Sequence, residues 1–295
     1  MSRPVKILSA AFTPSDAGAA LSVLNGVIHR GLDLLILPET CLGNQAEGVT
    51  LDSGEVKAVQ KAASDNRVNI VFPLYTASRG IKRINTALVI DRGGKIVASY
   101  EKLYPYWSEF DADPPCAVTG GGDCAAELDF GKIGLAICFD ANFPNVWQNL
   151  YELGAELVVW SSAYSAGMQL AAYSLIHHYP IATCTQVPDA ALYDVDGREV
   201  LYKKSDGGVC VMEFEIDLDR LIFHYNFNQD KAEKLIRERA DDVEIEKDYW
   251  REQWFILRSK KKDVSAAELA ARYGLTGLNE YQRDSREKID AMRIK

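Results

Sequence analysis

Closely spaced cysteines and histidines are missing from this sequence of 295 residues. Its six cysteines are scattered between Cys41 and Cys210 without a Cys-x-x-Cys pair, and its four histidines form no His-x-x-x-His pattern. Zinc sites and disulfide frameworks both depend on such spacings. We therefore expect no metal ion and no disulfide framework, and the scattered thiols favour a reducing, cytoplasmic compartment.

Long apolar runs and an excess of basic residues are missing as well. The first residues, Met1–Pro14, lack the apolar stretch that a secretory signal requires, and no run is long enough to span a membrane. The formal charge of −9 and the pI of about 5.1 disfavour binding to a phosphate backbone. We expect no secretory signal, no membrane partner and no nucleic-acid partner.

Apolar runs of strand length alternate with segments of helical periodicity along residues 1–228. The expected strands are Val5–Ala10, Asp33–Leu37, Val68–Leu74, Thr86–Ile90, Ile133–Cys138, Leu157–Trp160, Ile181–Thr185 and Gly208–Phe214. The expected helices are Asp16–Arg30, Gly54–Asn66, Val146–Leu153 and Met168–His178. Turn signals at Asp91–Gly94 and at Asp196–Gly197 add antiparallel hairpins. The sequence thus predicts an α/β domain with mixed sheets.

The composition changes at about residue 229, where charged stretches with sparse apolar residues begin. Lys231–Ala240 and Asn279–Met292 have the pattern of amphipathic helices. We therefore predict a main domain over 1–228 and a helical C-terminal extension over 229–295. Its apolar residues near Trp254 are too many for a solvated helix, so we expect the extension to pack on the domain or on a partner subunit.

One cysteine, Cys138, ends a strand of buried type and is followed at once by a turn and a helix. Unpaired N–H groups at a helix N-terminus favour a thiolate, so this position is expected to lower the pKa of the thiol. A thiolate at the end of a strand is suited to nucleophilic catalysis. The alternative is a buried structural cysteine.

Two further segments contain charged groups that are candidates for the same site. Glu39 follows Leu34–Pro38, and ligand sites of open α/β sheets gather at such strand ends. Lys102 lies among aromatic residues in Tyr100–Pro105, where a fixed ammonium can face an oxyanion. Taken singly, each residue is also typical of a solvated loop.

In this order, the motifs Leu-Pro-Glu at Glu39, Glu-Lys-Leu-Tyr-Pro at Lys102 and Gly-Leu-Ala-Ile-Cys-Phe-Asp at Cys138 resemble the nitrilase superfamily of carbon–nitrogen hydrolases. The resemblance covers about residues 4–225. It implies a four-layer α-β-β-α sandwich with two mixed sheets, covalent catalysis without a cofactor, and a homodimer or larger homo-oligomer.

The resemblance also implies a role for each residue. Glu39 is the general base, Lys102 stabilises the tetrahedral intermediate, and Cys138 is the nucleophile that forms a thioester. Glu109, in the loop after the lysine, is expected to position the substrate or Lys102. Further substrate contacts are expected from Phe139, whose backbone N–H faces the oxyanion, and from Tyr104, Asn142, Ser162 and Tyr164.

The residues around the nucleophile indicate a branch of the superfamily. Cys138-Phe139-Asp140 is similar to the amidase and carbamoylase branches, which favours a small amide or ureido substrate. Asn142 stands where many members have an arginine, so an N-carbamoyl amino acid with its carboxylate is disfavoured. The alternatives are nitrile hydrolysis by the same triad, a non-catalytic interaction module on this fold, and a Cys–His hydrolase that uses His177 or His178.

Overall fold

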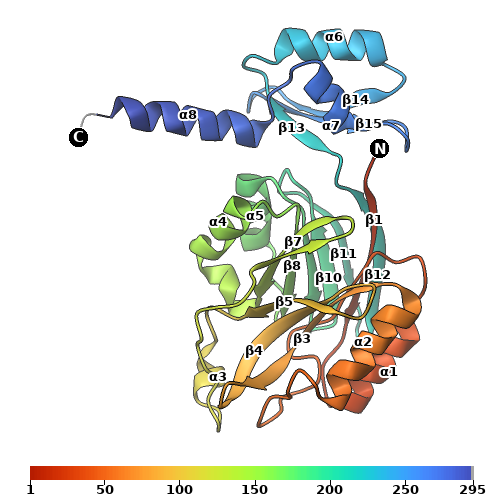
Figure 1. The fold of residues 1–295 in the computed structure, drawn as a ribbon, viewed down its shortest axis with the longest axis vertical. Helices are drawn as coiled ribbons and strands as arrows, with labels where there is room; N and C mark the ends of the chain where they lie inside the picture. Colours follow the sequence, from red (N-terminus) through yellow and green to blue (C-terminus); the bar gives the residue numbers. More distant parts are fainter. Residues whose placement is uncertain (294–295) are drawn as a thin grey trace. The chain divides into compact units, whose positions relative to one another are not determined.

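The structure of the protein, a computed structural model, describes residues 1–293 and divides into two units. The larger unit is Val5–Ile216, and the smaller unit joins Met1–Pro4 to the chain from Asp217 onward. Figure 1 shows both units as ribbons. The division lies about twelve residues before the boundary that the composition indicates, because a strand and a turn before residue 229 belong to the smaller unit.

The first sheet of the larger unit has six strands in the order β12-β1-β2-β3-β4-β5. Their bounds are Cys210–Asp217, Pro4–Ala11, Leu34–Ile36, Asn69–Ser78, Ile81–Ile90 and Ile96–Glu101. β1, β2 and β3 are parallel, whereas β3, β4 and β5 are antiparallel. Helices α1 (Ala17–Val27) and α2 (Gly54–Asn66) cover its outer face through one apolar cluster (Figure 1).

The second sheet also has six strands, in the order β11-β10-β9-β8-β7-β6. Their bounds are Glu199–Lys204, Asp189–Tyr193, Ile181–Thr185, Leu157–Ser162, Gly131–Ile137 and Ala125–Leu128. β7, β8 and β9 are parallel, and the outer pairs are antiparallel. Helices α4 (Pro144–Glu152) and α5 (Met168–His177) pack on this sheet through a second apolar cluster.

The two sheets face each other in the interior of the larger unit. The Ser161 hydroxyl donates to the Leu37 carbonyl at 2.8 Å, and the Cys184 thiol donates to the Ile36 carbonyl at 3.4 Å. The central parallel strands are buried on both faces, which explains their nearly continuous apolar sequence. The predicted four-layer sandwich with two mixed sheets is confirmed.

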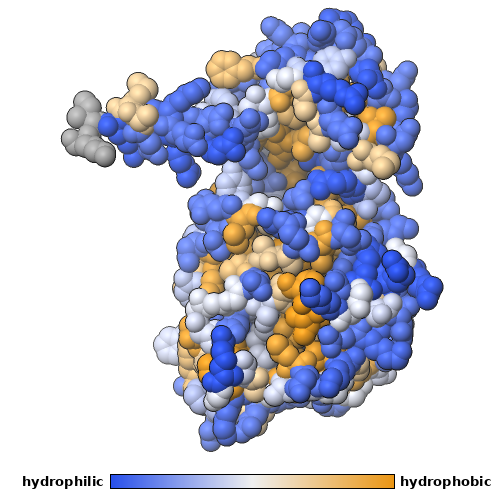
Figure 2. All heavy atoms as spheres, in the orientation of Figure 1, coloured by the Kyte–Doolittle hydropathy of each residue, from blue (hydrophilic) through white to orange (hydrophobic). Residues whose placement is uncertain are grey.

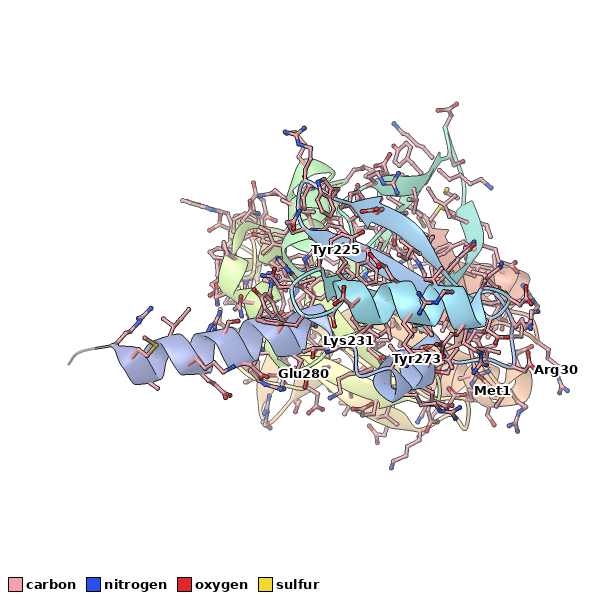
Figure 3. The ribbon with its side chains drawn as sticks, turned by 90° about the horizontal axis from the view of Figure 1, so that it is seen from above. Met1, Arg30, Tyr225, Lys231, Tyr273 and Glu280 are labelled. Atoms are coloured by element: carbon pink, nitrogen blue, oxygen red, sulfur yellow. The ribbon has the colours of Figure 1, made fainter. Side chains whose placement is uncertain are left out.

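The smaller unit contains a three-stranded antiparallel sheet in the order β13-β15-β14. Its strands are Leu221–His224, Trp254–Ser259 and Val243–Tyr249, and its helices are α6 (Gln229–Arg239), α7 (Ala266–Arg272) and α8 (Leu278–Met292). α6 and α7 pack on this sheet through a shared apolar cluster. α8 extends away from α6 (Figures 1 and 3) and has a mainly hydrophilic surface (Figure 2).

The prediction of a purely helical C-terminal extension was therefore wrong, although both predicted helices are present as α6 and α8. The apolar run at Trp254 is the central strand β15, whose residues Trp254–Leu257 are buried. Its neighbour β14 has the sequence VEIEKDY, in which the charged residues hide the period of two that marks a strand. None of the helices in residues 1–293 combines the length and the apolar character that a bilayer crossing requires.

The packing of α4 gives a direct test of this architecture. Leu150 is fully buried in the cluster between α4, α5 and their sheet, whereas Leu153 is 42% exposed. We expect Leu150→Ala to lower the free energy of unfolding by about 2–5 kcal/mol, because it leaves a cavity in a packed core. The matched change Leu153→Ala should cost less than about 1 kcal/mol. Urea unfolding measures both, and equal losses would contradict the described packing.

Candidate active site

Three of the predicted residues meet in one pocket of about 320 Å³ in the larger unit. Glu39 follows β2, Lys102 follows β5, and Cys138 follows β7. The Lys102 Nζ atom lies 2.7 Å from Glu39 Oε1. All three side chains are buried, with exposed fractions of 2–7%. β2 and β5 run in the same direction and end at the same edge of their sheet, which brings the base and the lysine together.

A second carboxylate, Glu109, reaches the same lysine. It lies in the short helix α3 (Trp107–Phe110), and its Oε2 atom is 2.6 Å from Lys102 Nζ. The backbone N–H of Tyr106 also donates to Glu109 Oε2 at 2.8 Å. The Lys102 ammonium is thus held between two carboxylates, an arrangement that fits the predicted role of Glu109 in positioning the lysine.

Asn85 of β4 joins the two carboxylates and was missed in the sequence. Its Nδ2 donates to Glu39 Oε1 at 2.8 Å and to Glu109 Oε1 at 2.6 Å. Asn85 and Lys102 therefore both bind the same oxygen of Glu39. The other oxygen, Oε2, is buried and has no hydrogen-bond partner among the described residues. Asn85 Oδ1 is also buried without a partner among these residues, but Glu39 Oε2 is the free acceptor that belongs to a carboxylate.

Cys138 occupies a strained turn at the end of β7. Its φ of +46° lies in the left-handed region, which is costly for a residue with a side chain. The turn is held by the buried Asp140, which accepts hydrogen bonds from Ile137 N at 2.9 Å, Tyr104 N at 3.0 Å and Tyr100 Oη at 2.7 Å. These contacts fix the direction in which the thiol points.

The electrostatics of Cys138 differ from the expectation of a lowered pKa. Burial, and then the negative charge of Glu39, raise the pKa of the thiol to about 12, although Lys102 opposes them. Burial outweighs the helix N-terminus, because the five-residue turn Cys138–Asn142 separates the thiol from α4. At neutral pH the Cys138 side chain is therefore a protonated thiol, which would need a base to act as a nucleophile.

Lys102 has the opposite balance. Burial by itself lowers the pKa of an amine, but the charges of Glu39 and Glu109, joined by that of Cys138 once its thiol ionises at high pH, hold the pKa of Lys102 well above its usual range. The lysine is therefore a permanent cation at the bottom of the pocket. A fixed ammonium of this kind can stabilise negative charge that develops on a substrate oxygen.

The five expected substrate contacts are not among the residues that line this pocket within residues 1–293. Tyr104 stacks on the ring of Phe143 with centroids 3.6 Å apart, and Phe139 packs edge-on against Tyr106. Asn142 is exposed on the outside of the turn. Ser162 and Tyr164 lie near Cys138, because a hydrogen bond from Ser162 lowers the pKa of the Cys138 thiol and the charge of Cys138 raises the pKa of Tyr164. Their contact with substrate stays a prediction.

Other side chains line the pocket in their place. Besides the four predicted catalytic groups, the lining consists of Thr40, Asn44, Tyr75, Arg83, Tyr106, Ser108, Ala112, Ala163 and Gln186. The polar side chains among them lie in loops, in α3 and in strands β3 and β4, where sequence periodicity gives no functional signal. Arg83 and Asn85 precede the expected strand Thr86–Ile90, so the sequence did not single them out.

The histidines expected for a Cys–His hydrolase lie elsewhere. His177 packs among aromatic rings, 5.5 Å from the ring of Tyr179 and 5.6 Å from that of Tyr151. The Nδ1 atom of His178 is 3.1 Å from the Val195 carbonyl oxygen. Neither histidine lines the pocket of Cys138. The Cys–His alternative is therefore not supported by the geometry.

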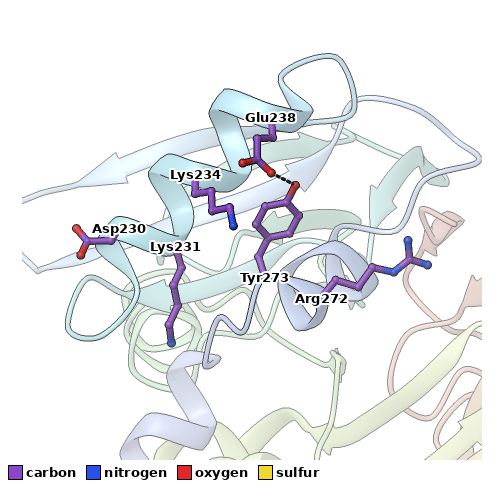
Figure 4. A pocket seen from close by; sticks show the side chains of 6 residues that line it. All are labelled: Asp230, Lys231, Lys234, Glu238, Arg272 and Tyr273. Carbon is purple, nitrogen blue, oxygen red and sulfur yellow. Dashed lines mark hydrogen bonds between the residues drawn. The ribbon is translucent and has the colours of Figure 1, made fainter.

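A second hollow lies on the smaller unit, between α6 and α7 (Figure 4). It is lined by Asp230, Lys231, Lys234, Glu238, Arg272 and Tyr273. The Tyr273 hydroxyl donates to Glu238 at 2.9 Å, and Lys231 Nζ donates to the Gly274 carbonyl at 2.7 Å. The lining residues include no cysteine, serine or histidine. The hollow has no counterpart of the constellation around Cys138.

Comparison with known proteins identifies the family and the fold. The sequence profile of the family described as "Carbon-nitrogen hydrolase" matches residues 13–222. Among curated relatives, "Hydrolase C26A3.11" of Schizosaccharomyces pombe is 28% identical over 50% of this chain and 49% of its own length. A formamidase of Allorhizobium ampelinum is 26% identical over 52% of this chain and 48% of its own length.

Further similarity is found to a deaminated glutathione amidase of Synechocystis, which is 28% identical over 50% of this chain and 60% of its own length. The matches thus span about half the length of these curated relatives. Two solved structures share the fold. Nit3 of Saccharomyces cerevisiae, a nitrilase-superfamily member, has a TM-score of 0.64 at 16% identity, covering 77% of this chain and 94% of its own. A Nesterenkonia amidase has a TM-score of 0.61 at 20% identity, covering 80% and 97%.

The protonation state of Cys138 can be measured by alkylation. Since only the thiolate reacts and the pKa is raised to about 12, we expect the rate with iodoacetamide to rise about tenfold per pH unit between about pH 7 and 10. Glu39→Gln removes a charge that raises this pKa, so the variant should react faster at each pH, whereas Glu127→Gln on the exposed strand β6 should not. Mass mapping of the Cys138 peptide gives the rates, and a rate that is flat with pH would contradict the assignment.

Proposed function

The chain belongs to the carbon–nitrogen hydrolase family, and from this premise we propose that it hydrolyses the carbon–nitrogen bond of a small amide through a thioester on Cys138. The observation that carries the proposal is the unpartnered Oε2 of Glu39, in the same pocket as Cys138 and Lys102. A buried carboxylate oxygen without a partner is costly unless its purpose is to receive a proton. The Cys138 thiol in the same pocket is the group that must lose a proton before it can attack.

The first half of the reaction forms the thioester. Glu39 Oε2 accepts the proton of the Cys138 thiol as the sulfur attacks the amide carbon. The Lys102 ammonium and the backbone N–H of Phe139 stabilise the negative charge on the former carbonyl oxygen; one such donor typically contributes ~10²–10³ in rate. The carbon–nitrogen bond then breaks, and Glu39 returns its proton to the leaving ammonia or amine.

The second half of the reaction consumes the thioester. A water molecule attacks the same carbon while Glu39 accepts one of its protons, and the oxyanion forms again beside Lys102. The carbon–sulfur bond breaks, the sulfur recovers the proton from Glu39, and a carboxylic acid leaves. Glu109 and Asn85 act as positioning residues, because they hold Lys102 and Glu39 and do not touch the reacting atoms.

Amide hydrolysis is favoured over the alternatives by two observations. The nucleophile is followed by Phe139 and Asp140, as in amidase-like branches, and two of the relatives are named as a formamidase and a deaminated glutathione amidase. A ureido substrate or a nitrile would use the same three residues. A non-catalytic interaction module is disfavoured, because nothing but chemistry requires a base, a cation and a thiol in one buried pocket.

The setting of the enzyme belongs to the same proposal. We infer from the family resemblance and the free thiols that it acts in the cytoplasm as a homodimer or larger homo-oligomer, with a small molecule as its substrate. All six cysteines are unpaired, which suits a reducing compartment. The smaller unit is proposed to pack on the larger unit or on a partner subunit. Sedimentation analysis of the full chain measures the assembly.

The thioester is the first target for an experiment. We expect turnover of at least one member of a panel of small amides, ureido acids and nitriles, with an acyl adduct on the native protein in intact mass spectra. Cys138→Ala should abolish turnover and adduct, because it removes the nucleophile. Cys124→Ala, the same change outside the pocket, should retain both. Turnover that persists in Cys138→Ala would reject the mechanism.

The base is tested separately. Glu39→Gln keeps the shape of the side chain but removes the proton acceptor, so kcat should fall ~10²–10⁴-fold. Ammonia release under saturating substrate measures kcat, and Glu127→Gln serves as the matched control. Thermal unfolding of both variants separates a loss of chemistry from a loss of fold. An unchanged kcat in a folded Glu39→Gln protein would remove Glu39 from the mechanism.

A further inference from the structure

Arg83 is a buried cation in the active-site pocket that the mechanism does not use. It lines the pocket with Glu39, Lys102 and Cys138, and its exposed fraction is 4%. It lies near the start of β4, two residues before Asn85, so both side chains project from the same face of the sheet. Arg83 therefore shares the chamber in which a substrate must bind.

The guanidinium group of Arg83 is held in place without a counter-ion. Its central carbon lies 3.9 Å from the centre of the Tyr75 ring, and its Nη2 atom donates to Asn44 Oδ1 at 2.5 Å. Its Nε atom is buried and has no hydrogen-bond partner among residues 1–293. Within the same residues, no Asp or Glu forms an ion pair with it.

The other cation of the pocket has the opposite environment. Lys102 is matched by two carboxylates at 2.7 and 2.6 Å. A buried guanidinium without a carboxylate is unfavourable in the free protein, because desolvation is not repaid by a partner. Such a group is retained where a ligand supplies the missing negative charge. Stacking on Tyr75 and the bond to Asn44 fix its orientation before the ligand arrives.

We propose that Arg83 binds a carboxylate of the substrate, so that the enzyme prefers amides that carry a carboxylate group away from the bond to be cleaved. The planar guanidinium lines the pocket, matches a carboxylate in shape and charge, and is not paired with an Asp or Glu of residues 1–293. This inference rests on the proposed function and names its substrate class. It also replaces the expectation that the absence of an arginine at Asn142 disfavours such substrates, because the arginine is supplied from β4.

The experiment compares amides that differ in charge and by a single methyl group. The carboxylate series is malonamate, succinamate and glutaramate, and the neutral series is their methyl esters. We expect the best carboxylate substrate of the native enzyme to exceed its ester by about 10²-fold or more in kcat/KM. The chain length at the optimum reports the spacing between Cys138 and Arg83.

Variants of Arg83 test its part in this preference. Arg83→Met should lower kcat/KM for the carboxylate substrate by about 10²-fold and leave that for the ester within about threefold. Arg83→Lys should retain part of the preference, because it keeps the charge but not the planar shape. Arg79→Met, in the exposed turn before β4, is the matched control and should behave as the native enzyme. Native-like circular dichroism establishes that each variant is folded.

Binding to Cys138→Ala provides a second measurement that needs no turnover. Calorimetry should detect succinamate but not its methyl ester, and adding Arg83→Met to this variant should abolish the binding. Equal handling of acid and ester by the native enzyme, or an equal loss for both in Arg83→Met, would overturn the inference and assign Arg83 to general charge balance. Arg83-dependent binding of succinamate without turnover or adduct would overturn the proposed function and leave the carboxylate site intact.

Discussion

The buried ion pairs of Lys102 with Glu39 and Glu109 are the constraint on which the active site depends. An ammonium removed from water is stable only when its partners and hydrogen bonds are all in place, and loss of one partner of a buried pair typically costs about 3–5 kcal/mol. The partners come from a loop after β2 and from α3, while Asn85 of β4 links them. The ion pairs can therefore form only when the strands of the first sheet pair in the described register.

The sandwich divides the chemistry between its two sheets. The first sheet brings Glu39, Lys102 and Arg83 to the pocket, whereas Cys138 follows β7 of the second sheet. The site exists only when the sheets are packed face to face, as the bond from Ser161 to Leu37 requires. The central parallel strands of both sheets are buried on both faces. This burial keeps water out of the interface between the sheets, where it would screen the charges in the pocket.

The sequence was sufficient for the larger fold and for the residues that follow strands. Glu39 and Cys138 could be singled out because each ends an apolar run, Lys102 because it lies among aromatic residues, and all three because their motifs occur in a recognisable order. Asn85 and Arg83 lie inside a strand, where their direction depends on register that a sequence does not reveal. The strand β14 was missed because its charged residues mimic a solvated helix.

The sign of the pKa shift at Cys138 could not be predicted for a related reason. Local sequence shows a turn and a helix after the cysteine, which favours a thiolate. Burial by the second sheet and the charge of Glu39 come from residues distant in sequence and dominate the result. Sequence reasoning thus located the chemical groups of the site more reliably than it described their environment.

The protonated state of Cys138 also determines how the protein withstands its surroundings. Peroxides and electrophilic metabolites attack thiolates far faster than thiols. In the proposed mechanism Cys138 gives up its proton to Glu39 only as the sulfur attacks, so between turnovers the buried thiol is a poor target for these reagents. The burial that raises the pKa of Cys138 thus also protects its sulfur from oxidation.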